Sequence, residues 1–142
     1  MISNDVIQAD IVAALKADPT LVAALGSDDR IKEAFYTGKE IDFPAVRVRI
    51  MRQMPISSRG ICDHANLSVS IRSFAEGGSS KQASQIAGLV VNALHGFEGG
   101  GKFFQGDGWA TYFRNTGYMG PFRTGEKLWS DEATFAGVVY PA

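Results

Sequence analysis

The stretch of sequence that decides the fold runs from residue 67 to residue 99 and reads LSVSIRSFAEGGSSKQASQIAGLVVNALHGFEG. Its first part alternates Leu67, Val69 and Ile71 with polar residues, which is the period of a half-buried strand. From about Ser80 to Leu94 the apolar residues recur at helical spacing instead. The stretch therefore predicts a strand, a glycine turn and a helix that packs on one face of a sheet.

A second strand with the same period lies upstream of this stretch. Val46, Val48 and Ile50 alternate with Arg47 and Arg49 after a proline. Residues 55–60 have the composition of a loop. The two strands and this loop predict a long antiparallel hairpin with one polar face.

The N-terminal segment has the pattern of two helices. Asn4 or Ser3 can cap the first, and the Asp18-Pro19 pair ends it, because proline disfavours a helical residue before it. We expect Thr20 to cap a short second helix and a glycine, Gly26, to close it. The chain then leads toward a strand.

The C-terminal part predicts two more strands, near residues 103–114 and 133–140. Residues 115–130 hold glycines, a proline and aromatics, and they predict either an extended loop or an irregular strand pair. Residues 1–142 therefore predict a single α+β domain: an antiparallel sheet of about four or more strands with two main helices packed on one face.

Composition restricts the class of protein further. The formal net charge of −1 gives no global attraction to nucleic acid or to an anionic membrane surface. One cysteine, Cys62, cannot form an internal disulfide or a cysteine metal cluster. The first ten residues lack the basic region of a secretory signal, and no apolar run approaches the length of a membrane span. We expect a soluble protein made in a cytoplasm.

The residues that could perform chemistry do not form a reactive set. The only histidines, His64 and His95, lie far apart in the sequence, and neighbouring Cys62 and Asp63 point to opposite faces if they lie on a strand. There is no G-x-S-x-G elbow and no phosphate-binding G-K-[ST] motif. We therefore predict no enzymatic activity, with no catalytic, cofactor-binding or metal-binding residues.

Two groups of residues are candidates for an interface. Arg47 and Arg49 lie on the polar face of the predicted hairpin, which is either a solvated face or a basic patch for an acidic partner or DNA. Aromatic residues crowd the stretch from 103 to 129, where they either pack under the sheet or anchor a protein interface. The interface hypothesis selects Tyr118, Phe122 and Trp129.

Several of these patterns together resemble one family, the tail terminator or tail-completion proteins of long-tailed bacteriophages. The opening IVAALKADPTLVAALGSDDRI is similar to the helix, short second element and strand of that family. FPAVRVRI resembles its first long strand, and ATFAGVVY resembles its closing strand. The stretch from 67 to 99 is the most specific part, with its strand, turn, alanine-rich helix and ALxGF ending.

The resemblance implies a structural virion protein whose copies form a ring, expected to be hexameric, at the head-proximal end of the tail. Such a ring caps the tail tube protein and meets the head-tail connector or neck protein. Genomic DNA would pass through its channel without sequence-specific binding, and assembly would take place in the host cytoplasm. The alternatives are another neck or tail-tube component, or a small cytosolic ligand-binding domain or enzyme.

Overall fold

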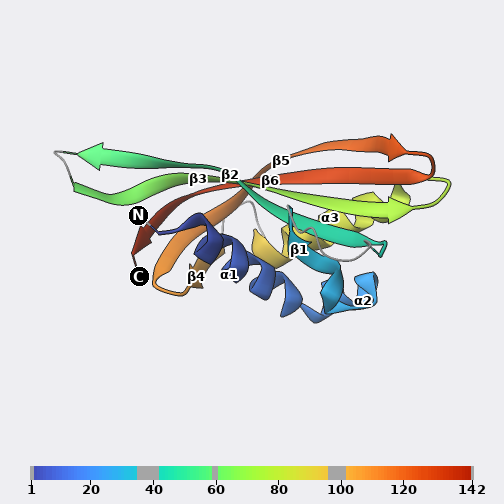
Figure 1. The fold of residues 1–142 in the computed structure, drawn as a ribbon, viewed down its shortest axis with the longest axis horizontal. Coiled ribbons are helices and arrows are strands. Elements are labelled where there is room, and N and C mark those ends of the chain that lie inside the picture. The colour runs from blue at the N-terminus through green and yellow to red at the C-terminus, as the bar shows by residue number, and fades with distance from the viewer. Residues whose placement is uncertain (1, 35–41, 59–60, 96–101, 142) are drawn as a thin grey trace.

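The computed structural model describes residues 2–34, 42–58, 61–95 and 102–141 of the chain (Figure 1). The elements in chain order are α1 (Asn4–Lys16), α2 (Pro19–Leu25), the 3-10 turn η1 (Asp28–Arg30), β1 (Ile31–Glu33), β2 (Ala45–Ser58), β3 (Ile61–Glu76), α3 (Lys81–Leu94), β4 (Lys102–Gly106), β5 (Trp109–Gly125) and β6 (Leu128–Pro141).

The strands form one curled, mixed sheet in the order β1-β2-β3-β6-β5-β4. β1 runs parallel to β2, and all the other neighbours are antiparallel. The prediction of an antiparallel sheet with two main helices is therefore wrong: the described residues form six strands and three α-helices. The pattern led toward a strand after the second helix, but it gave neither the bounds nor the parallel partner of β1, because three residues are too few to show a period. The pattern also joined β4 and β5 into one strand.

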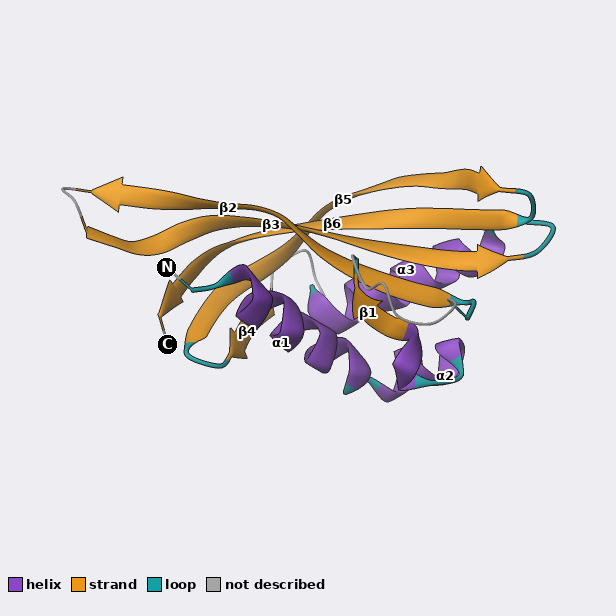
Figure 2. Ribbon diagram, in the orientation of Figure 1, coloured by secondary structure: helices purple, strands orange, loops and turns teal. Residues whose placement is uncertain are grey.

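The helices lie together along one side of the sheet (Figure 2). They bury Ile7, Ile11 and Leu15 from α1 and Ile86 and Val90 from α3 against it. The same core contains strand residues that share one face of the sheet, including Val46, Val48, Val69, Ile71 and Phe135. The opposite face of the sheet, called here the outer face, is not covered by the described helices.

The cap of the second helix differs from the prediction. Asp18, not Thr20, is the N-cap residue, and its Oδ1 accepts hydrogen bonds from the backbone N–H groups of Thr20 (3.0 Å) and Leu21 (3.1 Å). Pro19 occupies the first turn, where its missing N–H costs nothing. Gly26 ends the helix with φ of 89°, as the sequence predicted.

Two long hairpins extend toward opposite ends of the molecule, and the first of them projects well beyond the helices (Figure 1). The first is β2–β3, whose pairing continues through Ile56 and His64, so most of the predicted loop at 55–60 belongs to a strand. Residues 59 and 60 themselves lie outside the described residues. The second is β5–β6, which contains residues 115–130 and is the irregular strand pair, with three shifts of register. We call these hairpins the β2–β3 arm and the β5–β6 arm.

Candidate interaction surface

The outer face of the sheet concentrates positive charge in its central part. Residues paired directly across antiparallel strands share a face, so the registers define three rows. The rows are Arg47, Arg72, Glu132 and Met119; Arg49, Ser70, Thr134 and Gly117; and Arg52, Ser68, Ala136 and Arg114. They carry five arginines and one carboxylate, whereas the whole chain has a formal net charge of −1. We call these three rows the arginine face.

The single carboxylate in these rows is bound within its own sheet. Glu132 is only 8% exposed. Its Oε1 accepts a hydrogen bond from Ser70 Oγ at 2.8 Å, and its Oε2 accepts one from Arg72 Nε at 3.2 Å. These bonds compensate the cost of burying the carboxylate. Glu132 therefore balances Arg72, and the arginine face keeps a positive excess.

The two arginines predicted for the interface have different roles in the structure. Arg47 is half-buried, and its Nη1 donates to the carbonyl oxygens of Arg30 (3.0 Å) and Val46 (2.9 Å). These bonds join β2 to the end of η1, so Arg47 helps to hold β1 beside β2. Arg49 is exposed two residues further along the same face. Of this pair, Arg49 is therefore the more exposed residue.

The β5–β6 arm exposes ten consecutive residues, 118–127. β4 pairs only with residues 109–113 of β5, so among the described strands β5 forms the edge of the sheet beyond that point. Tyr118, Met119 and Phe122 are 54%, 56% and 40% exposed. Exposed apolar side chains on an ordered strand are typical of a protein interface.

Tyr118 and Phe122 lie on opposite faces of this arm. Phe122 pairs with Ser130 on the outer face, and Tyr118 pairs with Ala133 on the helix side. Partial burial, and to a smaller extent the charge of Asp131, raise the pKa of the Tyr118 hydroxyl. Tyr118 therefore stays neutral at physiological pH and can enter an interface without losing a charge.

Trp129 lies near the tip of the arm, next to the first residue of β6, and is half-buried. Its indole Nε1 donates to the carbonyl oxygen of Gly77 at 3.1 Å, which ties the start of β6 to the turn before α3. The five predicted interface residues thus lie on one sheet, but they do not form one cluster. Arg47 lies on the outer face of β2, whereas Tyr118 lies on the helix side of β5, and β3 and β6 separate these two strands.

The β2–β3 arm carries a second set of exposed apolar side chains that the sequence analysis missed. Met51, Met54 and Ile56 are 52%, 40% and 42% exposed. The sequence contains a signal for them, because Met54 and Ile56 continue the alternation of the strand, but the proline between them favours a loop. Both arms therefore present apolar side chains away from the core.

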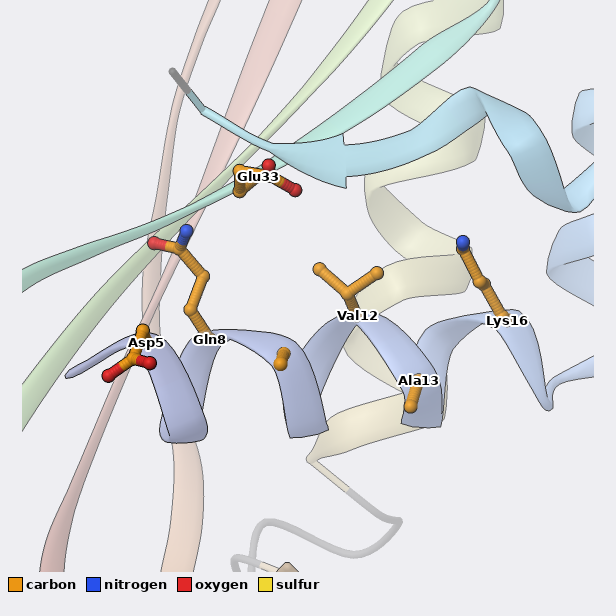
Figure 3. Close-up of a pocket in the computed structure, with 7 residues that line it drawn as sticks. Asp5, Gln8, Val12, Ala13, Lys16 and Glu33 are labelled. Carbon is orange, nitrogen blue, oxygen red and sulfur yellow. The ribbon is translucent and has the colours of Figure 1, made fainter. Parts of the chain in front are cut away.

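An open groove of about 480 Å³ runs along α1 on the helix side of the molecule (Figure 3). Gln8, Val12 and Lys16 extend from α1 on the side where Glu33 lies, at the end of β1 (Figure 3). The groove is lined by Asp5, Gln8, Ala9, Val12, Ala13, Lys16 and Glu33. It offers an apolar floor, with Asp5 at one end of α1 and Lys16 at the other.

The described residues hold no group of three or more histidine, cysteine, aspartate or glutamate side chains that could bind a metal ion. His64 is exposed and stacks on Tyr140, with ring centroids 6.0 Å apart. His95 Nδ1 accepts a hydrogen bond from the backbone N–H of Asn115 at 2.6 Å, which supports β5. The side chains of Cys62 and Asp63 lie outside the described ones. In the described part of the chain, no helix has the length and apolar character needed to cross a membrane.

A curled sheet whose two arms present apolar side chains, with an arginine face between them, defines a protein that works through contacts with other proteins. The chain belongs to the family of tail completion proteins: residues 9–101 match the family described as Tail completion protein gp17. It is thus a structural protein of a phage tail and is associated with the virion. This confirms the family predicted from the sequence.

Solved structures share the fold at low sequence identity. A chain from the virion of a native gene transfer agent particle matches with a TM-score of 0.67 at 17% identity, over 97% of this chain and 99% of that one. A second solved chain matches with a TM-score of 0.61, also at 17% identity, over 100% of both chains. None of the curated proteins matches the sequence.

Proposed function

We propose that residues 1–142 act as one unit, six copies of which form a ring that caps the head-proximal end of the tail tube. The ring would stop growth of the tube and join it to the head connector. Membership of the tail completion family supports this role. The observation that carries the ring is the pair of arms, because each presents three large apolar side chains on ordered strands at opposite ends of the molecule.

The arms suit a ring better than a pair of copies. They differ in sequence and lie at opposite ends of the sheet, so each copy can contact two neighbours through two different surfaces. Such heterologous contacts close into a ring when the rotation between copies closes. Burial of Met54, Tyr118 and Phe122 in these contacts would remove apolar surface from water, at roughly 25 cal/mol for each Å².

The proposed mechanism is geometric and requires no catalysis. One side of the ring would match the last ring of tail tube protein, and the other would match the neck. Genomic DNA would pass through the channel without sequence-specific recognition. The interface would include Arg49, Tyr118 and Phe122, while Arg47 and Trp129 would hold the strands that present them. Assembly would take place in the host cytoplasm.

Electron microscopy of particles from a phage in which this gene is disrupted tests the role. We expect tails of irregular length that lack heads, and restoration of normal particles when the intact gene is supplied. Normal particles without the gene would refute the proposal. Tails of normal length without heads would indicate a different neck component instead.

The contribution of the β5–β6 arm is tested on the purified protein mixed with purified tail tubes. The double variant Tyr118→Ala/Phe122→Ala should keep its thermal unfolding midpoint, because exposed residues contribute within about 0.5 kcal/mol, but it should fail to cap tubes. Phe103→Ala is a matched control, since Phe103 is also 54% exposed but lies on β4. Normal capping by the double variant would show that this arm is not an interface.

A further inference from the structure

Positive and negative charge are separated between the two sides of this molecule. The outer face carries five arginines and the single buried carboxylate of Glu132 in its three central rows. By contrast, the N-terminal segment from α1 to η1 holds five aspartates and two basic residues, Lys16 and Arg30. α1 packs on the other side of the sheet, so the arginine face and α1 lie on opposite sides of it (Figure 2).

The acidic side also has a shape that can receive side chains. The groove along α1 has two carboxylates, Asp5 and Glu33, and one cation, Lys16, in its lining, so the lining keeps a negative excess beside the apolar side chains of Val12 and Ala13. Such a lining fits a cationic group that lies next to an apolar one. Arg52 and Met54 on the β2–β3 arm form such a pair, with Arg52 Nη2 3.8 Å from Met54 Sδ.

We propose that, in the ring, the arginine face of each copy packs against the α1 groove of the next copy. This inference rests on the proposed function and names a pair of surfaces that would join its subunits in addition to the arms. The two surfaces lie on opposite sides of one sheet, so a single copy cannot bring its own pair together. Contact between them is therefore intermolecular and heterologous, which is the kind of interface that a closed ring requires.

The charges would set the orientation and the rate of this contact more than its strength. Complementary potentials steer two surfaces together and oppose wrong arrangements, and salt screens them. Apolar side chains such as Met54 against the floor of the groove would contribute burial. Assembly of the ring should accordingly become slower as the salt concentration rises.

Charge reversal provides the test, with ring formation on purified tail tubes measured by electron microscopy and sedimentation. The first variant, Arg52→Glu/Arg114→Glu, makes the outer face acidic at two exposed positions. The second variant, Asp5→Lys/Glu33→Lys, makes the groove basic. Each variant alone should raise the protein concentration needed for ring formation by at least about tenfold, because like charges would then face each other.

Mixing the two variants in equal amounts should restore assembly. The acidic face of the first then meets the basic groove of the second, and the normal face of the second meets the normal groove of the first. An alternating ring with an even number of copies satisfies every contact. Restoration by mixing also proves that both variants are folded. Asp42→Lys/Asp107→Lys is the control, because it reverses two exposed carboxylates that lie outside the groove, the arginine face and both arms, and it should leave assembly unchanged.

The remaining outcomes overturn the inference. If the mixture fails where the unmodified protein assembles, or if neither variant impairs assembly, the two surfaces do not meet, although the ring itself would stand. If Arg52→Glu/Arg114→Glu assembles normally but no longer binds a 20-base-pair DNA duplex that the unmodified protein binds, the arginine face serves DNA instead. If the unmodified protein forms no ring on tail tubes, the proposed function fails as well.

Discussion

Replacement of Asp10 by alanine should destabilise the fold, because it removes the acceptor of two long-range hydrogen bonds. Asp10 Oδ2 accepts hydrogen bonds from the indole Nε1 of Trp109 at 2.5 Å and from the backbone N–H of Asp107 at 2.9 Å. These bonds join α1 to the β4–β5 turn. An added Cβ at Gly106 would collide with both partners of the Asp10–Trp109 bond, which explains the glycine at this position.

The magnitude follows from the burial of the two donors. The Trp109 side chain is 0% exposed, so the Asp10→Ala variant leaves its N–H without an acceptor at a cost of about 1–3 kcal/mol. Asp107 is exposed, so its N–H can turn to water. Alanine regains about 0.5 kcal/mol of helix propensity. The net loss should be about 1.5 kcal/mol, or roughly 5–6 °C in the unfolding midpoint for a domain of this size.

Thermal unfolding followed by circular dichroism measures this loss. Asp10→Asn keeps an oxygen acceptor but loses its charge, so it should lower the midpoint by about half as much. Asp28→Ala is the control, because Asp28 is exposed and should change the stability by less than about 0.5 kcal/mol. A midpoint for Asp10→Ala within about 1 °C of the unmodified protein would refute the reasoning.

Two further predictions concern stability. Gly88→Ala should stabilise the protein by about 0.5–1 kcal/mol in urea unfolding, because Gly88 lies inside α3 and an added Cβ meets no heavy atom within 4 Å; an unchanged midpoint would contradict this. The pKa of Tyr118 is raised above 10.0, so the folded state holds this proton more tightly than the unfolded state. The stabilisation of the folded state that results from this raised pKa is complete below pH 10.0 and is lost as the pH rises further. The Tyr118→Phe variant should therefore lose less stability above pH 10.0 than the unmodified protein.

Local patterns predicted the elements in which the hydrophobic period repeats often enough to be recognised. The helix predicted from Ser80 to Leu94 is α3 (Lys81–Leu94), because its apolar stripe repeats over several turns. The strand with Leu67, Val69 and Ile71 buries these three residues, since one alternating face must meet the core. The family resemblance came from the same patterns.

The interface residues were harder to predict, because exposure depends on distant parts of the chain. Phe113 and Phe122 are both aromatic residues of β5, yet Phe113 is 1% exposed and Phe122 is 40% exposed. The difference arises because α3 and β4 lie beside one part of β5 and not the other. A count of aromatics in the stretch cannot separate the two cases.

The sequence by itself determined the type of most elements and the side that each turns to the core, because periods of 2 and 3.6 residues are set by the backbone. Only the tertiary structure decided which strands are neighbours, that β1 is parallel to β2, and that two arms leave the body. Those features depend on contacts such as the bond between Asp10 and Trp109, which are 99 residues apart. The separation of the arginine face from the acidic α1 side also depends on the tertiary structure. This separation exists only after distant strands have paired and the helices have packed on one side of the sheet.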